Sequence, residues 1–259
     1  MTDKISARIL WFSEISKEDL PIVGGKSSNL GEMVRLKTIP VPNGFSTTSY
    51  AYKEFIREND LDDKILDIIK KTDIDDSKIH YIEDGEGFPF IICHGARFNA
   101  RTYEETGTIQ AVVDSGFHAM SIDFPGYGKS ENLAMEMSTF ISSFIDALKL
   151  EPVVILGASM GGEAVTGFAT KYPDKVRALI LVGAVGIADF EANLSKLDGK
   201  PMLLIWGKND SISAPGNYEL LMRYNQSAEF SNIGRQHACY LDDSKGFNER
   251  IKEFLAKIK

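Results

Sequence analysis

The sequence predicts an α/β protein: a mostly parallel, doubly wound sheet over residues 78–259, preceded by a small, mainly helical segment over residues 1–77. From Lys78 onward, short apolar runs alternate with helix-compatible segments, which is the pattern of a parallel sheet with helices on both faces. One apolar run leads through a Gly-x-Ser-x-Gly turn into a helix-compatible segment, which predicts a strand, a tight turn and a helix. The first 77 residues lack this alternation, so we expect them to form a separate unit.

Composition and charge narrow the possible functions. The 259 residues suffice for one large domain or for two unequal ones. A net charge of -8 disfavours nucleic acid or an anionic membrane surface as the main partner. Two cysteines are too few for a disulfide framework or a zinc-type cysteine pair. The N-terminus lacks a signal-peptide pattern and no apolar run is long enough to span a bilayer, so we expect a soluble, cytoplasmic protein. The sequence leaves the oligomeric state open.

The N-terminal segment is expected to contain one strand and three helices. The apolar run from Ile9 to Phe12 predicts the strand. Ser27 or Ser28 can cap the first helix, which carries apolar residues between Leu30 and Val34. Two prolines and a glycine in residues 40–45 exclude a helix there and predict an extended turn. The remaining expectations are helices over Thr48–Asn59 and Leu61–Lys71 and an acidic connector over Thr72–Ser77.

This N-terminal segment resembles the start of phosphoenolpyruvate synthase and of pyruvate phosphate dikinase, through the stretches GGKSSNLGEM and PVPNGFSTTSYAYKEF. In that family the segment opens an ATP-grasp domain, and the lysine that matches Lys26 contacts nucleotide phosphates. The family's acidic magnesium ligands, second nucleotide-binding lobe and phosphohistidine domain do not follow here. A phosphate site needs several converging donors and a metal. We therefore expect residues 1–77 to be non-catalytic, a possible lid or packing module, with binding of a nucleotide or a partner as the alternative.

The second part is expected to alternate strands with helices. The predicted strands are Lys78–Glu83, Phe88–Cys93, His118–Ile122, a run from Val153 to Gly157, Lys175–Val182, Met202–Trp206 and Glu229–Ile233. The first two strands are expected to form a hairpin, because Asp84-Gly85-Glu86-Gly87 joins them. The predicted helices are Tyr103–Ser115, Ala134–Leu148, Glu163–Tyr172 and Asn248–Lys257.

Ser159 is the candidate nucleophile. It lies at the centre of the Gly-x-Ser-x-Gly turn, where Gly157 and Gly161 allow the tight packing that a strained serine conformation requires. This geometry raises the serine hydroxyl above the end of a parallel sheet. A serine hydroxyl is a poor nucleophile at neutral pH, so it needs a base that is itself oriented by an acid.

Asp210 and His237 are the candidate acid and base. Asp210 follows the predicted strand that ends at Trp206, and His237 follows the last predicted strand. The carboxyl ends of parallel strands meet at one edge of a sheet, so both side chains are expected to lie near Ser159. The chain order serine, aspartate, histidine is that of α/β-hydrolases. Of the other histidines, His94 is expected to hold its own loop by hydrogen bonds.

The oxyanion of a tetrahedral intermediate needs two preplaced N–H donors. Met160, directly after the candidate nucleophile, is expected to supply one of them. The loop His94-Gly95-Ala96 is expected to supply the other through the Ala96 N–H. This machinery requires no metal and no organic cofactor.

The second part of the chain also resembles α/β-hydrolases, through HGARF, DFPGYGKSE, GASMGG, GKND and HACYLDD. HGARF and H-x-C-Y-L-D make it most similar to the lidless α/β-hydrolase domain-containing protein 14, or interacting-factor-B, family. That resemblance implies a serine hydrolase acting on small acyl esters, and acetyl transfer has been proposed for one member. The glycines on both sides of Ser159 are closer to common esterases than to that subfamily.

The substrate pocket is expected to be nearly open, because only about twenty residues separate Val182 from Met202 and leave no room for a full helical cap. Residues flanking the catalytic loops are expected to line it: Arg97, Phe98, Met160, Ile212 and Tyr240. Arg97 has two interpretations: it binds an anionic acyl group, or it forms an internal salt bridge or a loop hydrogen bond. The sequence thus predicts hydrolysis of small carboxylic esters, with acyl transfer, thioester hydrolysis or lactone hydrolysis as alternatives on the same triad.

Overall fold

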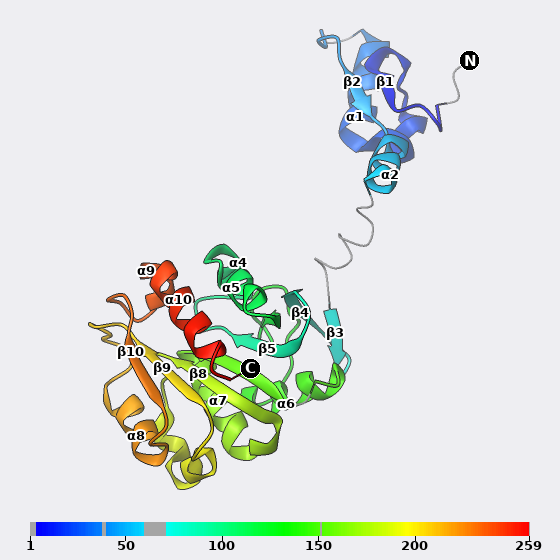
Figure 1. Ribbon diagram of the computed structural model, residues 1–259. Helices are drawn as coiled ribbons and strands as arrows, with labels where there is room; N and C mark the ends of the chain where they lie inside the picture. Colours follow the sequence, from blue (N-terminus) through cyan, green and yellow to red (C-terminus); the bar gives the residue numbers. More distant parts are fainter. Residues whose placement is uncertain (1–3, 38–39, 60–70, 151, 259) are drawn as a thin grey trace. The chain divides into compact units, whose positions relative to one another are not determined.

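The computed structural model describes residues 4–37, 40–59, 71–150 and 152–258. The chain divides into two compact units, Met1–Asp67 and Ile68–Lys259 (Figure 1). The division falls ten residues before the boundary expected from the sequence, because a strand precedes Lys78.

The N-terminal unit combines helices with a two-stranded antiparallel sheet. Strand β1 (Ile9–Trp11) pairs with β2 (Phe45–Thr47), so that Leu10 faces Ser46 on the buried side. Helix α2 (Ser49–Glu58) is capped by the Thr48 hydroxyl, which accepts the Ala51 N–H at 3.1 Å. The other elements among the described residues of this unit are two short 3₁₀ helices, η1 (Phe12–Glu14) and η2 (Lys17–Asp19), and helix α1 (Leu20–Leu36).

The start of α1 differs from the expectation. The helix begins at Leu20 and is interrupted at Gly24, whose φ of 75° and ψ of 168° are not helical. Ser27 and Ser28 therefore lie inside the helix, and the expected serine cap is wrong. The Ser27 hydroxyl instead accepts a hydrogen bond from the Ser46 hydroxyl at 2.9 Å.

The expected connector over Thr72–Ser77 is also wrong. Strand β3 (Lys71–Ile74) pairs antiparallel with β4 (Ser77–Asp84). Asp75 and Asp76 join the two strands with φ values of 45° and 63°, the left-handed conformation of a two-residue hairpin turn that aspartate tolerates. The helix expected over Leu61–Lys71 lies almost wholly outside the described residues, and Lys71 itself begins β3.

The C-terminal unit, Ile68–Lys259, is built on an eight-stranded sheet with the order β10-β9-β8-β7-β5-β6-β4-β3. The six strands from β10 to β6 are parallel, and β4 and β3 continue the sheet antiparallel. Their bounds are β5 (Phe88–Cys93), β6 (Phe117–Ile122), β7 (Val153–Ala158), β8 (Val176–Val182), β9 (Met202–Trp206) and β10 (Glu229–Asn232).

Helices cover both faces of this sheet, because successive strand residues point to opposite sides. Ile91 and Cys93 of β5 belong to one buried cluster with α6 (Met137–Ala147), α7 (Met160–Lys171) and α8 (Gly216–Tyr224). Phe90 and Ile92 belong to a second cluster with α5 (Thr108–Asp114) and α10 (Ser244–Leu255), on the other side of the sheet (Figure 1). This arrangement is the doubly wound sheet that the sequence predicts.

Two local expectations fail in this unit. The hairpin expected between β4 and β5 is wrong, because β6 pairs with both strands and lies between them. Glycine is required in the intervening turn because a Cβ on Gly87 would lie 2.6 Å from the Gly116 oxygen, just before β6. The helix expected over Tyr103–Ser115 is divided into α4 (Arg101–Glu105) and α5, because Gly107 adopts a φ of 71°.

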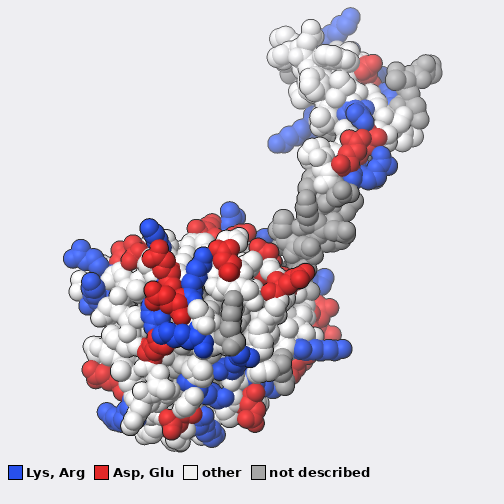
Figure 2. Space-filling model, viewed as in Figure 1, with Lys and Arg blue, Asp and Glu red and all other residues white. Residues whose placement is uncertain are grey.

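Few residues separate β8 from β9, as expected. They form the 3₁₀ segment η4 (Ile187–Leu197), which packs against α7 and α8. Figure 2 shows positive and negative side chains interspersed on the face of the C-terminal unit in view. Among the described residues, no helix is both long and apolar enough to cross a membrane.

Candidate active site

Five loops at the carboxyl edge of the sheet build the candidate site. They follow β5, β7, β8, β9 and β10, and they carry Ala96, Ser159, Gly183, Asp210 and His237 in that order. These five strands are parallel and consecutive in the sheet. Their loops therefore converge at one edge, although the residues span much of the chain.

Ser159 occupies the sharp turn between β7 and α7. Its φ of 51° and ψ of -117° are strained for a residue with a side chain, and its N–H donates to the Val182 oxygen at 2.9 Å. A Cβ on Gly157 would collide with the Gly161 oxygen, and one on Gly161 would collide with the Cys93 oxygen. Both glycines therefore have the steric role that the sequence predicts for them.

Asp210 and His237 form a hydrogen-bonded pair. The His237 Nδ1 lies 2.8 Å from Asp210 Oδ2 and 3.0 Å from Oδ1. The Asp210 side chain is only 2% exposed, and its Oδ1 also accepts the N–H groups of Ile212 and Ser213 at 2.8 and 2.9 Å. Because an ionised carboxylate only accepts hydrogen bonds, His237 carries its proton on Nδ1. Its Nε2 is buried and has no hydrogen-bond partner among the described residues.

Gly183, at the end of β8, is a site residue that the sequence reasoning missed. Its φ is 50°, and a Cβ there would lie 3.0 Å from both Asp210 Oδ2 and His237 Nδ1. Only glycine leaves room for this pair. The available signal was the pair Gly183 and Gly186 directly after an apolar run, which local reasoning interprets as an ordinary turn.

The loop after β5 is held by His94, as expected. The His94 side chain is fully buried, its Nδ1 lies 2.8 Å from the Gly95 oxygen, and its Nε2 accepts the Phe124 N–H at 3.1 Å. Burial lowers the pKa of His94, so the ring stays neutral and can make both hydrogen bonds. The loop closes on itself through the Phe98 N–H, which donates to the Gly95 oxygen at 3.0 Å.

The two expected oxyanion donors are backbone N–H groups at the two sides of Ser159. Met160 is the first residue of α7, where helix N–H groups have no partner within the helix. Ala96 lies in the loop that His94 holds. Neither N–H donates to another group within the part of the chain that the structure describes.

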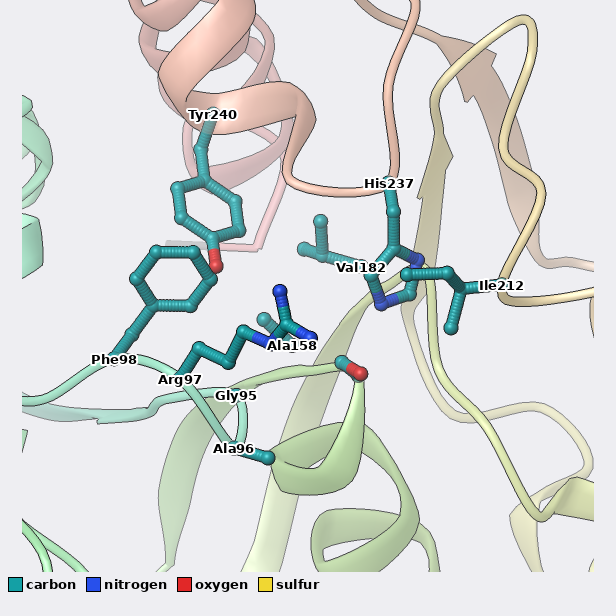
Figure 3. Close-up of a pocket in the computed structure, with 10 residues that line it drawn as sticks. Gly95, Ala96, Arg97, Phe98, Ala158, Val182, Ile212, His237 and Tyr240 are labelled. Carbon is teal, nitrogen blue, oxygen red and sulfur yellow. The ribbon is translucent and has the colours of Figure 1, made fainter.

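A cavity of about 210 Å³ opens at this edge (Figure 3). The residues expected to line a pocket do so, with the exception of the Met160 side chain, whose sulfur accepts the Tyr127 hydroxyl at 3.4 Å. The lining consists of Gly95, Ala96, Arg97, Phe98, Ala158, Ser159, Val182, Ile212, His237 and Tyr240. The candidate nucleophile and base therefore face the same cavity.

Asp123, after β6, holds the segment that follows β5 through hydrogen bonds. It accepts the Ala100 N–H at 2.6 Å and the Lys129 N–H at 2.9 Å, and it lies 2.8 Å from His80 Nδ1. Burial alone would raise the pKa of Asp123, but these hydrogen bonds outweigh it and hold the pKa below its usual range. The carboxylate thus joins β4 to the loops that follow β5 and β6.

The two cysteines are buried close to the site. Burial raises the pKa of the Cys93 thiol, and it raises that of Cys239 to about 12, so both stay protonated near neutral pH. Among the residues described, no group of three histidine, cysteine or acidic side chains is placed to hold a metal ion.

The fold and the site together define an α/β protein of the hydrolase type. The chain belongs to the alpha/beta hydrolase family, whose model matches residues 90–243, more than half of the 259 residues. A second family model, the pyruvate phosphate dikinase AMP/ATP-binding domain, matches residues 20–148. The part of that match from β4 onward nevertheless folds as strands and helices of the hydrolase sheet.

Different relatives match different parts of the chain. Protein ABHD14A of Danio rerio is 27% identical over 173 residues, which cover 65% of this chain and 64% of that protein. The phosphoenolpyruvate synthase of Synechocystis is 46% identical over 76 residues, which cover 28% of this chain and only 9% of that protein. The crystal structure of a predicted CIB-like hydrolase from Thermoplasma acidophilum superposes with a TM-score of 0.69 at 20% identity, covering 73% of this chain and 97% of that one. This last likeness shows the fold alone.

Proposed function

We propose that this protein is a serine hydrolase that cleaves small carboxylic esters through an acyl-serine intermediate. The observation that carries the proposal is the His237–Asp210 pair. It leaves His237 Nε2 without a partner among the described residues, and His237 lines the same cavity as Ser159. A histidine fixed in this tautomer has one nitrogen available to accept the proton of a serine hydroxyl.

In the first half-reaction, Ser159 Oγ attacks the ester carbonyl while His237 Nε2 takes the hydroxyl proton. The carbonyl oxygen becomes an oxyanion, which the N–H groups of Ala96 and Met160 stabilise. His237 then returns the proton to the leaving alcohol as the C–O bond breaks. In the second half-reaction a water attacks the acyl-serine, gives its proton to Nε2, and the proton returns to Ser159 as the acid leaves.

The test is turnover of 4-nitrophenyl esters of graded chain length by the wild type and by Ser159→Ala. We expect hydrolysis of short esters to fall by at least about 10³-fold in the variant, because the nucleophile is lost. Ser143→Ala, a serine of α6 outside the cavity, is the control. Equal turnover by the wild type and Ser159→Ala would refute the mechanism.

The same panel, extended to thioesters and lactones, separates ester hydrolysis from the alternatives on this triad. Adding an acceptor alcohol or amine tests acyl transfer, which would raise nitrophenol release without raising acid release. Binding of a nucleotide by the N-terminal unit, where Lys26 is exposed on α1, is a separate proposal, and calorimetry with Mg-ATP tests it.

A further inference from the structure

The chemical asymmetry of the cavity carries a further inference about the substrate. The lining is mostly apolar, and apart from the candidate catalytic residues its polar side chains are those of Arg97 and Tyr240. Figure 3 shows the Arg97 side chain reaching into the cavity from the loop after β5, with its guanidinium in view between Tyr240 and His237.

Arg97 has no acidic partner. Within the described ranges it makes no ion pair, and the cavity lining contains no aspartate or glutamate. The candidate catalytic acid, Asp210, already accepts hydrogen bonds from His237 and from two backbone N–H groups. The internal salt bridge that the sequence left open for Arg97 is therefore not formed by the residues that the structure describes.

The position of Arg97 is defined by its neighbours. The preceding residue, Ala96, is a proposed oxyanion donor, and the following one, Phe98, closes the loop through its hydrogen bond to Gly95. Consecutive Cα atoms are about 3.8 Å apart, so a carbonyl oxygen held at the Ala96 N–H lies within reach of the flexible Arg97 side chain. A negative charge on the substrate, a few bonds from the ester carbonyl, can then contact the Arg97 guanidinium.

We propose that Arg97 recognises a carboxylate on the substrate, so that the preferred esters are short and anionic. This inference rests on the proposed ester hydrolysis. A guanidinium binds a carboxylate with two parallel hydrogen bonds, in a geometry that lysine cannot reproduce. The cavity of about 210 Å³ is smaller than ordinary ligand pockets, which span roughly 300–1,000 Å³, so it fits a short substrate.

The experiment compares esters that differ only in charge. Ethyl hydrogen succinate carries the carboxylate on the acyl part, and ethyl succinamate replaces it with a neutral amide of the same shape. Acetoxyacetate and acetoxyacetamide form the same pair with the charge on the alcohol part. Hydrolysis of each ester is followed by acid release, for the full-length wild type, Arg97→Met, Arg97→Lys and the control Arg101→Met. Arg101 lies on α4, outside the cavity lining, and pairs with Glu105.

We expect the wild type to prefer one of the two anionic esters over its amide by at least about tenfold in kcat/KM, since a hydrogen bond to a charged group is stronger than one to a neutral group. Arg97→Met should abolish this preference mainly through KM, and Arg97→Lys should restore part of it. The pair that responds tells whether the carboxylate belongs to the acyl or the alcohol part.

Two results would overturn the inference while the proposed function stands. In the first, the wild type hydrolyses the amide-bearing esters as well as the anionic esters. In the second, Arg97→Met loses activity on the anionic and the neutral esters to the same extent. A wild type that hydrolyses none of the four esters or the nitrophenyl esters would overturn the proposed function, and the inference with it.

Discussion

Gly183 lies so close to His237 that a side-chain carbon at position 183 would be 3.0 Å from His237 Nδ1. We expect Gly183→Ala to lower kcat by at least about tenfold, because displacing the base by even an ångström misaligns proton transfer. Gly199→Ala is the matched control. Gly199 also has a positive φ, 72°, but nothing lies within 4 Å of the position of its Cβ. Equal activity losses in the two variants would show that backbone strain, and not contact with the pair, is the cause.

The strained backbone of Ser159 predicts a stability gain when its side chain is removed. Strain of this kind costs about 1–3 kcal/mol, whereas glycine adds about 0.5–1 kcal/mol of unfolding entropy. Ser159→Gly should therefore unfold at higher urea concentration than Ser159→Ala, by about 1 kcal/mol in the free energy of unfolding. Both variants lack the hydroxyl, so the comparison isolates the Cβ. A Ser159→Gly protein no more stable than Ser159→Ala would contradict the prediction.

The depressed pKa of His94 predicts a pH dependence of stability. The folded state resists protonating this ring, whereas the unfolded chain protonates it below about pH 6.5. The contribution is therefore complete above that pH and is lost as the pH falls from about 6.5 toward the lower folded pKa. Between pH 7.5 and 5.5 the free energy of unfolding should fall further in the wild type than in His94→Gln.

Urea unfolding at both pH values measures this effect in a Trp11→Phe background. The chain has two tryptophans, and Trp206 is buried in the C-terminal unit, so its fluorescence alone then reports on that unit. An equal pH slope in the two proteins would mean that His94 is not a source of the pH dependence.

Two truncations separate the N-terminal unit from the C-terminal unit. A chain that starts at Ile68 keeps β3, whereas one that starts at Lys78 loses the β3–β4 ladder and the buried Ile74. We expect the longer truncation to lower the free energy of unfolding by about 2–4 kcal/mol relative to the shorter one, as for other losses of a buried isoleucine. Both proteins lack Trp11, so Trp206 again reports the transition. Equal stabilities would show that β3 contributes nothing to the unit.

The shorter truncation also tests the proposal that the N-terminal segment acts as a lid or packing module. If it does, removal of residues 1–67 should change the chain-length preference for nitrophenyl esters or the stability of the C-terminal unit. Unchanged solubility, stability and ester preference would refute both roles.

Much of the sheet could be predicted because each strand is encoded locally. β5 and β9 have the bounds expected from the sequence, since each is an apolar run bounded by turn residues. The structure also brings Asp210 and His237 into hydrogen-bond contact and places His237 and Ser159 at the same cavity. These residues follow strand ends in a recognisable order. The parallel topology brings those strand ends to the same edge of the sheet.

The features that could not be predicted from the sequence depend on contacts between residues far apart along the chain. The turn Asp84-Gly85-Glu86-Gly87 has hairpin chemistry, but long-range packing inserts β6 between the strands it joins. Gly183 is required by side chains that come 27 and 54 positions later in the chain. The true start of α1 did carry a local signal, because Pro21 lies in its first turn, where proline is favoured.

Strand β3 forms the outer edge of the sheet, and every residue proposed to act on substrate comes after it in the chain. An edge strand pairs with only one other strand of the sheet. The chain segment before β3 can therefore change without disrupting the parallel strands. The topology therefore makes this protein a natural acceptor for gene fusion. Domain shuffling could join a fragment of a phosphoenolpyruvate-synthase-like gene to the hydrolase here, and a protein engineer can exchange that fragment at the same junction.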